Sequence, residues 1–427
     1  MSYFLELKMM TSMKNLPTYL PAAVLALVFF FVAVRRVGAV RLQIWQVMTA
    51  GASAVLLTGG ITVRDAVRAV NLDVILFLFG MFVVGEALQR SGLLYHLAYR
   101  LFRKAHSTDL LVIMILIFGG AISALLMNDT MAIIGTPLVL YYARRYRIKA
   151  RLLLLALMFG VTVGSVCSPI GNPQNLLIAL GGRLRSPFVD FVRYLFLPTA
   201  INLSVTYGLL RLFYWREFHA APLIHGREKL NDPDLARLCR LSLAVVVVMI
   251  GAKIVLVTFM VPFDFKLTYI AICAAVPLLL FSPERGVLLK RIDWQTLLFF
   301  VSMFILMQAV WNSGLLQKSL AALSADLGSI PVVLGLSVVV SQLVSNVPFT
   351  ALYLPLLMNL ASPLKALLAL AAGSTLAGNL FILGAASNVI VIQNAEKEGE
   401  TVTFMEFARI GLPLTVLNIL VVLAFLN

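Results

Sequence analysis

Apolar residues in this chain gather into long runs, and short polar or basic segments separate those runs. A helix needs about 20 apolar residues to cross the roughly 30 Å hydrocarbon core of a bilayer. By this measure the pattern predicts ten membrane-crossing helices. They are expected at 18–34, 42–58, 71–89, 151–180, 194–215, 240–260, 267–281, 293–311, 363–393 and 410–426.

Two further apolar stretches, 109–143 and 330–361, are interrupted by polar residues. Asn128-Asp129-Thr130 leaves a second leg of 13 residues, and Ser345-Asn346-Val347-Pro348 leaves legs of 15 and 13 residues. A 13-residue helix is only about 20 Å long, which is too short to cross the core. We therefore predict two re-entrant hairpins with tips near the bilayer middle, where irregular backbone must be enclosed by protein or face water.

Two of the predicted crossings are also broken. The run 151–180 contains Ser168-Pro169-Ile170-Gly171-Asn172-Pro173, and two prolines this close together stop a helix. The run 363–393 contains Gly378-Asn379 and then GAASN at 384–388. An unbroken helix of that length would be about 45 Å long, so a break there is expected on length as well.

Composition agrees with a membrane protein. The chain is 427 residues long, 61% hydrophobic and 12% charged, with a mean hydropathy of +0.97. Soluble proteins are about 45–50% apolar and about 25% charged. This excludes a soluble enzyme, a disordered regulator and a disulfide scaffold. Because membrane barrels use short alternating strands, the long runs predict an all-α polytopic membrane protein.

The net charge of +15 does not indicate a nucleic-acid partner, because the basic residues fall in the loops. With the N-terminus outside, 23 Lys and Arg lie in inner loops and 10 in outer ones, with Lys253 within a span. We therefore expect a multi-pass protein of the cell inner membrane with both termini outside. The three cysteines form no CxxC pair and no histidines pair at ligand spacing, so no metal or cofactor is expected.

The two halves of the chain repeat each other. The segments 71–94 and 293–316 share nine of 24 positions without a gap. Asn128 and Asn346 occupy the two hairpin tips, and Gly171 and Gly384 occupy the two breaks, in the same order. Each half then holds five crossings, an odd number, so the halves insert in opposite orientations. We predict inverted repeats at 18–215 and 240–427, joined by a cytoplasmic linker at 216–239, which is typical of a secondary transporter.

The four interruptions are the predicted substrate site, because broken helices expose N–H and C=O groups at their ends. The side chains there are mostly amides and hydroxyls, which suit a small solute; simple capping of the broken helices is the alternative. The candidate binding residues are Asn128, Asp129, Thr130, Ser168, Asn172, Gln174, Asn175, Ser345, Asn346, Thr350, Asn379, Ser387 and Asn388.

Two acidic residues are candidates for proton coupling, because acids within membrane spans are costly and usually functional. Asp129 lies at the first hairpin tip, and Glu86 lies in the third predicted span, where the second repeat has Gln308. Asp129 could instead cap the second hairpin leg, and Glu86 could instead reach solvent near its helix end.

These motifs resemble the ion transporter superfamily from about residue 40 to the C-terminus. The resemblance rests on Asn128-Asp129, SPIGNPQNLLIA at 168–179, SNVPFTALYLPLL at 345–357 and AGNLFILGAASNVIVIQNA at 377–395. Within this superfamily the sequence is most similar to the branch that contains the arsenite permease (ArsB) and the NhaD sodium/proton antiporter. The resemblance implies a scaffold and a moving transport region, dimers, and, for the arsenite type, a soluble ATPase partner.

The arsenite branch implies export of arsenite or antimonite in exchange for protons. Neither tip keeps the Ser-Asn-Thr motif of the dicarboxylate carriers, and no Lys or Arg lies at the four interruptions. The GAASN break looks closer to the sodium/proton and P-protein branches. Sodium/proton exchange and organic-anion symport therefore remain open as alternatives, and a channel is the alternative of another class.

Overall fold

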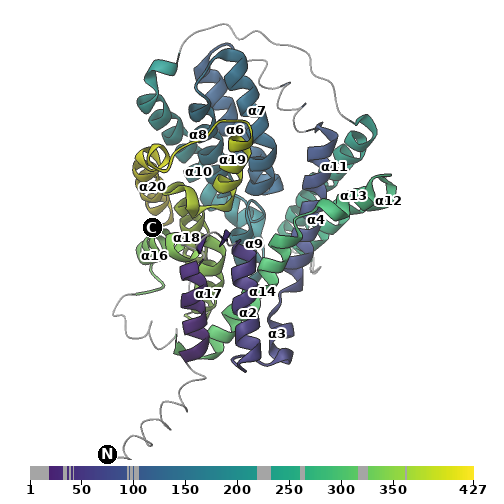
Figure 1. Cartoon of the computed structure of the whole chain (residues 1–427), viewed down its shortest axis with the longest axis vertical. Helices are drawn as coiled ribbons and strands as arrows, with labels where there is room; N and C mark the ends of the chain where they lie inside the picture. The colour runs from purple at the N-terminus through teal and green to yellow at the C-terminus, as the bar shows by residue number, and fades with distance from the viewer. Residues whose placement is uncertain are drawn as a thin grey trace, which may run out of the picture.

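The computed structural model describes residues 19–31, 36–37, 40–41, 43–93, 96, 100, 105–218, 232–259, 265–315, 326–360 and 363–427. Within these residues the chain is almost entirely helical, as predicted (Figure 1). The strands described are β1 (Arg36–Val37) and β2 (Val40–Arg41), which pair antiparallel in a two-residue ribbon.

The first half of the chain follows the predicted order of elements. Its helices are Tyr19–Phe31, α2 (Ile44–Leu57), α3 (Val63–Ala69), α4 (Leu72–Ser91), α6 (Thr108–Leu126), α7 (Asn128–Tyr146), α8 (Ala150–Ser165), α9 (Pro173–Gly181), α10 (Pro187–Phe213) and the short 3-10 helix η1 (Trp215–Glu217).

The second half repeats this order, with each label raised by ten. Its helices are α11 (Pro233–Thr258), α12 (Leu267–Phe281), α13 (Arg285–Arg291), α14 (Trp294–Asn312), α16 (Ile330–Val344), α17 (Asn346–Asn359), α18 (Leu364–Leu376), η2 (Ala377–Asn379), η3 (Ile382–Gly384), α19 (Ala386–Lys397) and α20 (Phe404–Leu426). Equivalent helices begin alike: the side chains of Asn71 and Asp293 cap α4 and α14 by accepting the N–H groups of Val74 and Thr296.

Six helices in the described residues are individually long and apolar enough to span a membrane: α4, α6, α10, α11, α14 and α20. The predicted crossings at 151–180 and 363–393 are each made of two helical pieces, α8 with α9 and α18 with α19. Three helices begin six or seven residues earlier than predicted: α10 begins at Pro187, α11 at Pro233 and α20 at Phe404. Part of the predicted linker 216–239 is therefore helical, while 219–231 lies outside the described residues.

The predicted length of the second leg of the first hairpin is wrong. Both α6 and α7 have 19 residues, about 28 Å each, where a second leg of 13 was expected. The apolar run ends at Arg144 and Arg145, but the helix continues through them because cations stabilise the carbonyl end of a helix. The second hairpin agrees with prediction, with legs of 15 and 14 residues.

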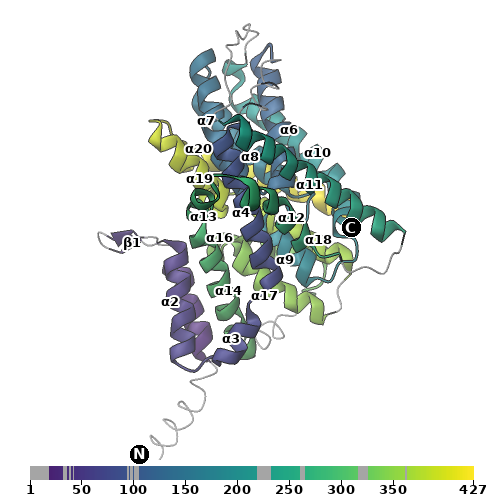
Figure 2. The same ribbon diagram turned by 90° about the vertical axis from the view of Figure 1, so that its right-hand side faces the viewer.

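The two halves exchange packing partners symmetrically. Helix α12 of the second half packs on α4 of the first, and α2 packs on α14. In the same way α9 packs on α17, and α19 packs on α7. Hairpin α6–α7 lies toward one end of the molecule and hairpin α16–α17 toward the other, in both views (Figures 1 and 2). This is the arrangement expected of inverted repeats that share one core.

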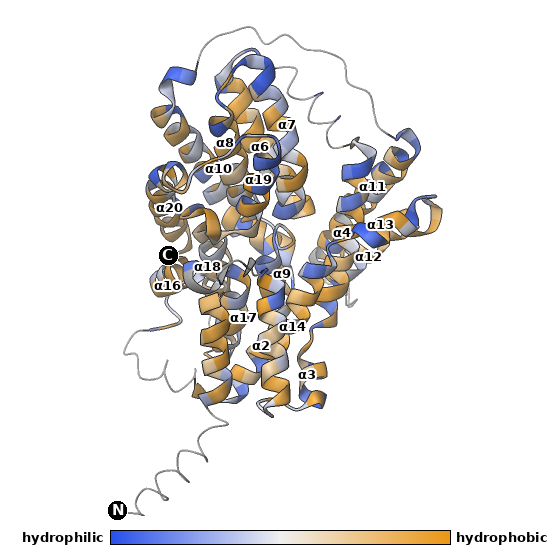
Figure 3. Cartoon of the chain, viewed as in Figure 1, coloured by the Kyte–Doolittle hydropathy of each residue, from blue (hydrophilic) through white to orange (hydrophobic). Residues whose placement is uncertain are grey.

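Two glycine contacts set how closely the helices approach. A Cβ at Gly164 of α8 would lie 2.1 Å from the Cα of Gly120 in α6, so these backbones are in direct contact. A Cβ at Gly80 of α4 would lie 2.6 Å from the carbonyl oxygen of Ala271 in α12. Small residues of this kind allow helices to pack closely in lipid. Apolar residues also face outward on many helices, as expected for a lipid-facing surface (Figure 3).

Candidate functional site

Each hairpin turns on a single residue with an unusual backbone. Met127 has φ 73° and ψ 146°, and Ser345, at the equivalent place, has φ 73° and ψ 155°. This region is normally restricted to glycine and costs roughly 1–3 kcal/mol for other residues. Helices α7 and α17 begin immediately afterwards, with Asn128 and Asn346. Both tips therefore hold strained backbone beside the partial positive charge of a helix N-terminus.

The first break is closed by its own amides. The side-chain oxygen of Asn172 caps α9 by accepting the N–H of Asn175 at 2.9 Å. The Asn175 amide donates to the carbonyl oxygens of Ser165, Val166 and Ser168 at 3.0–3.4 Å. These bonds satisfy the carbonyls that the end of α8 leaves free. The capping interpretation is therefore correct for Asn172.

A threonine from the second half completes this network. Thr375 of α18 accepts hydrogen bonds from the side chains of Asn172 (3.1 Å) and Gln174 (3.3 Å). Its hydroxyl donates to the side-chain oxygen of Asn175 at 3.2 Å. All four residues are buried. The first break is thus locked to the helix that precedes the second break.

The second break has the same core bond but fewer partners. The amide of Asn388 donates to the carbonyl oxygen of Gly378 at 2.7 Å, as Asn175 does to Ser165. The residue equivalent to Asn172 is Ala385, which has no side-chain cap to offer. The bond from Asn388 therefore holds the second break together, while the other side-chain polar atoms at this break have no hydrogen-bond partner in the described residues.

Buried polar atoms without a hydrogen-bond partner gather at the second break and at both tips. Burying such atoms costs roughly 1–3 kcal/mol each, so a group of them marks a place that can bind a polar partner. The unpaired atoms include Asn128 Oδ1, Asn346 Oδ1, Thr350 Oγ1, both side-chain polar atoms of Asn379, Ser387 Oγ and Asn388 Oδ1.

A continuous series of contacts joins the four interruptions. The backbone N–H of Asn128, at the first tip, donates to the carbonyl oxygen of Gly171 in the first break at 2.9 Å. The first break bonds to Thr375, close to the second break. Gln342 of the second hairpin donates to the carbonyl oxygen of Ala377 in the second break at 2.6 Å. The predicted site residues therefore come from both halves and lie around one core.

The two candidate acids lie in different surroundings. Asp129 is partly buried in the first turn of α7, between the buried Asn128 and Thr130. Helix α4 approaches this tip through Gly85, where a Cβ would lie 3.1 Å from the Thr130 hydroxyl oxygen. Glu86 instead lines a cavity of about 540 Å³ with Gln89, Arg90 and Arg291. Asp129 therefore lies at the hairpin tip through its place in the first turn of α7, whereas Glu86, next to Gly85, lines a separate cavity.

Sequence reasoning missed several polar residues that line or support the site. Thr375 and Thr162 occupy equivalent places in α18 and α8, and Thr162 has an unpaired buried hydroxyl. A Cβ at Gly384 would lie 2.8 Å from Gln342 Oε1, so this glutamine reaches the second break. A glutamine within an apolar hairpin leg was the available signal for Gln342. Thr375 and Thr162 carried no signal in the sequence, because hydroxyl side chains are common in membrane helices.

The buried Asn202 and Asn418 were also missed. They occupy equivalent places in α10 and α20, and the Asn202 amide donates to the carbonyl oxygen of Asn418 at 3.4 Å. Within the described part of the chain, no group of three or more His, Cys, Asp or Glu could hold a metal ion.

Residues 27–366 match the model of the family described as CitMHS, citrate transporter. This chain belongs to the CitMHS family. It is a multi-pass membrane transporter, consistent with the repeats and the interrupted helices. The family assignment replaces the narrower arsenite-permease and NhaD resemblance as the statement of what the chain is.

Curated proteins resemble this chain over most of its length. The chain is 28% identical over 371 residues to the 46 kDa membrane protein of Mycobacterium leprae, covering 82% of this chain and 84% of that protein. It is 25% identical over 460 residues to the P protein of Sus scrofa, covering 86% of this chain and 54% of that protein. The chain therefore spans about half the length of the P proteins it matches.

The fold also matches a solved structure. The YdaH transporter of Alcanivorax borkumensis, described as having an unusual topology, superimposes with a TM-score of 0.58 at 16% identity. The match covers 96% of this chain and 97% of that chain. At this identity the likeness concerns the fold alone.

Proposed function

We propose that this CitMHS-family protein is a proton-coupled secondary transporter that exports arsenite or antimonite. The observation that carries the proposal is the set of unpaired amide and hydroxyl groups at the two tips and the second break. Amides both donate and accept hydrogen bonds, so they can hold a solute that does the same.

The charge at the four interruptions supports a neutral solute. Residues 127–131, 165–175, 345–350 and 377–388 contain no Lys or Arg, and Asp129 is their one carboxylate. Arsenite near neutral pH is an uncharged trihydroxide, which offers three donors and several acceptors to an amide-lined site. An anionic solute in such a site would find no Lys or Arg to offset its charge, which is costly away from water.

Asp129 is the proposed carrier of the coupling proton. It lies at the first tip next to Asn128, whose side-chain oxygen is unpaired. A carboxyl group at that position can exchange a proton while the solute binds to the neighbouring amides. Glu86, in its cavity with Arg90 and Arg291, is proposed as a secondary proton site near the end of α4.

A tricarboxylate is the alternative that the family description favours. The helix N-termini of α7, α9, α17 and α19 all begin at the interruptions, and each offers partial positive charge to an anion. A citrate ion would still need a bound cation to offset its charge. Sodium/proton exchange is the other alternative, favoured by the free side-chain oxygens of Asn128, Asn379 and Asn388.

Everted membrane vesicles carrying the full chain test the proposal. A pH gradient is established, and arsenite, antimonite, sodium and citrate are added in separate samples while the gradient is followed. We expect arsenite and antimonite to dissipate the gradient, because each solute molecule moves in exchange for protons.

Vesicles with the Asp129→Asn variant are the control and should show no arsenite response. Dissipation by sodium alone would support the antiporter alternative and overturn the arsenite proposal. A change in the gradient, in either direction, on addition of citrate alone would support the organic-anion alternative. Solute movement that never moves protons would indicate a channel.

A further inference from the structure

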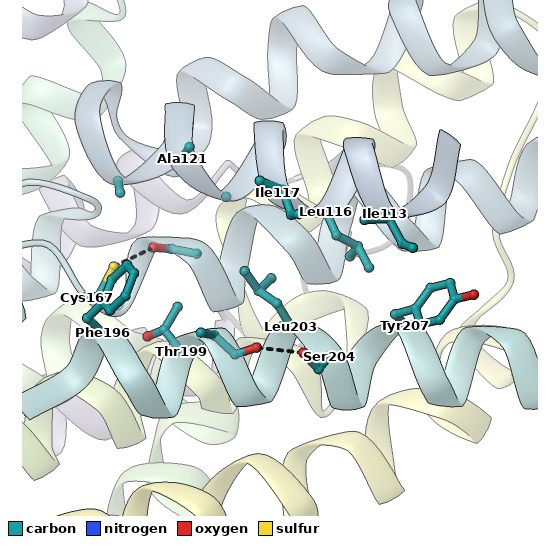
Figure 4. A pocket seen from close by; sticks show the side chains of 14 residues that line it. Ile113, Leu116, Ile117, Ala121, Cys167, Phe196, Thr199, Leu203, Ser204 and Tyr207 are labelled. Atoms are coloured by element: carbon teal, nitrogen blue, oxygen red, sulfur yellow. Dashed lines mark hydrogen bonds between the residues drawn. The ribbon is translucent and has the colours of Figure 1, made fainter. Parts of the chain in front are cut away.

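An apolar groove runs along the outer surface of the first half, away from the interruptions. It lies between α6 and α10, with α8 as its floor, and has a volume of about 480 Å³. Ile117 of α6 and Phe196 of α10 line it and are each 58% exposed, so it opens sideways toward the lipid (Figure 4). Gly120 and Gly164 form its floor, where the backbones of α6 and α8 touch.

We propose that this groove binds one acyl chain of an anionic phospholipid. The proposal does not depend on which solute the protein carries. Its occupant is taken from the bilayer itself, because the groove opens at hydrocarbon depth between two helices that are each long enough to span a membrane.

Most polar groups that line the groove bond within the protein, and the buried hydroxyl of Thr199, which has no hydrogen-bond partner in the described residues, is the exception. The hydroxyl of Ser204 donates to the carbonyl oxygen of Ala200 at 3.0 Å, and the thiol of Cys167 contacts the carbonyl oxygen of Gly164 at 3.5 Å (Figure 4). The Tyr207 hydroxyl donates to Asp109 at 2.5 Å. With Ser204, Cys167 and Tyr207 paired inside the protein, the surface left for a ligand is hydrocarbon-like apart from the Thr199 hydroxyl.

The length of the groove is close to the thickness of the hydrocarbon layer of one membrane leaflet. Its lining on α10 runs from Phe196 to Tyr207, which is about 17 Å of helix. Half of a bilayer core of roughly 30 Å is about 15 Å. An acyl chain that lies parallel to α10 would therefore fill the groove without crossing into the other leaflet.

A cluster of polar residues at one end of the groove points to the headgroup. Arg211, one turn beyond Tyr207, donates to the Tyr207 hydroxyl at 3.1 Å and pairs with Asp109 at 3.2 Å, and its side chain is 58% exposed. Trp215 follows at the end of α10 and is 66% exposed, as is typical of residues at a membrane interface. Arg211 and the nearby Arg216 and Arg409 favour an anionic phosphate over a neutral headgroup.

The groove lies next to the first break, so a lipid bound there would contact the elements that form the proposed transport site. Cys167 lines the groove and directly precedes Ser168 of the first break. The bound acyl chain would also contact α6, which is the first leg of the hairpin that carries Asn128. A bound chain would thus hold the hairpin, the broken helix and α10 together.

Lipid retention by the purified full chain tests the proposal. Native mass spectrometry is used with added phosphatidylglycerol, on wild type and on Ala200→Trp, whose indole would fill the groove. We expect wild type to retain one tightly bound lipid and Ala200→Trp to bind it at least about tenfold more weakly. Val192→Trp is the matched control, because Val192 is exposed on the same helix outside the groove, and it should bind as wild type does.

Three further variants distinguish binding of the acyl chain from binding of the headgroup and cover the case in which Ala200→Trp does not fold. Arg211→Gln should reduce the preference for phosphatidylglycerol over phosphatidylcholine by several-fold, whereas Arg193→Gln at the other end of α10 should not. Ala121→Leu, on the facing wall, repeats the test if Ala200→Trp does not fold. Equal lipid retention by wild type and both filling variants would overturn the proposal. So would a wild-type dimer that Ala200→Trp dissociates without any change in retained lipid, because a second copy would then be the occupant.

Discussion

One position decides the difference between the two breaks. Asn172 caps α9 and bonds to Ser165 and Thr375, whereas Ala385 occupies the equivalent place before α19. As a result the first break is satisfied within the protein, and Ser387 and Asn388 of the second keep unpaired oxygens. We propose that the amides at the first break hold its structure and that the unpaired groups at the second break bind the solute.

Alanine substitutions at Asn172 and Ser387 should therefore separate stability from binding. Asn172→Ala removes a cap and two buried bonds, so it should lower the free energy of unfolding by about 1–3 kcal/mol. Ser387→Ala breaks no hydrogen bond found in the described residues, so its stability should stay within about 0.5 kcal/mol of wild type.

Ser387→Ala should impair transport more than Asn172→Ala does, although it destabilises the protein less. Losing one hydrogen bond to the solute is worth about 1 kcal/mol, which corresponds to roughly a fivefold higher KM for Ser387→Ala. Thermal melting in detergent and the KM of solute flux in liposomes measure the two effects. A stability loss in Ser387→Ala as large as that in Asn172→Ala would contradict the assignment of roles.

At the level of elements, the backbone contact between Gly120 and Gly164 fixes how α6 packs on α8. A Cβ at Gly164 would lie within 2.1 Å of the Gly120 Cα, so neither helix can accept a side chain without moving apart. Since α6 is the first leg of the hairpin and α8 leads into the first break, this contact positions both interruptions.

Gly164→Ala should consequently destabilise the protein by at least about 1–3 kcal/mol, through overpacking of one backbone against another. Gly251→Ala in α11 is the control, because nothing lies within 4 Å of its added Cβ. The yield of monodisperse protein in size-exclusion chromatography measures the difference. If both variants behave alike, the close contact is not needed for packing.

The sequence predicted most elements because their signals are local. Apolar runs located the crossings, and the prolines at 169 and 173 located the first break. The length of α7 was missed because Arg144 and Arg145 end the apolar run but not the helix. Thr375 was missed because its role depends on a partner 200 residues away in the chain, which no local pattern reveals.

At the scale of the whole molecule, the halves exchange partners around one core. Helix α4 packs on α12 and α14 on α2, while hairpin leg α7 packs on α19 and α17 on α9. The close approach of Gly85 to Thr130 joins these groups at the first tip. We propose that the helices of the first pairs form a scaffold and that the hairpins with the broken helices move against it.

The orientation of the chain can be tested with reporter fusions. The distribution of basic residues predicts both termini outside and the segment 219–231 inside. Alkaline phosphatase fused after Asn427 should therefore be active, and green fluorescent protein inserted within 219–231 should fluoresce. An inactive phosphatase with a fluorescent C-terminal fusion would reverse the orientation.

Proton coupling at Asp129 can be measured directly with the purified protein. Purified protein is placed in liposomes, a pH gradient is imposed, and arsenite uptake is compared between wild type, Asp129→Glu and Asp129→Asn. Gradient-driven uptake should occur in wild type, persist at a reduced rate in Asp129→Glu and vanish in Asp129→Asn, with all three proteins folded. Equal gradient-driven uptake by Asp129→Asn and wild type would contradict the account.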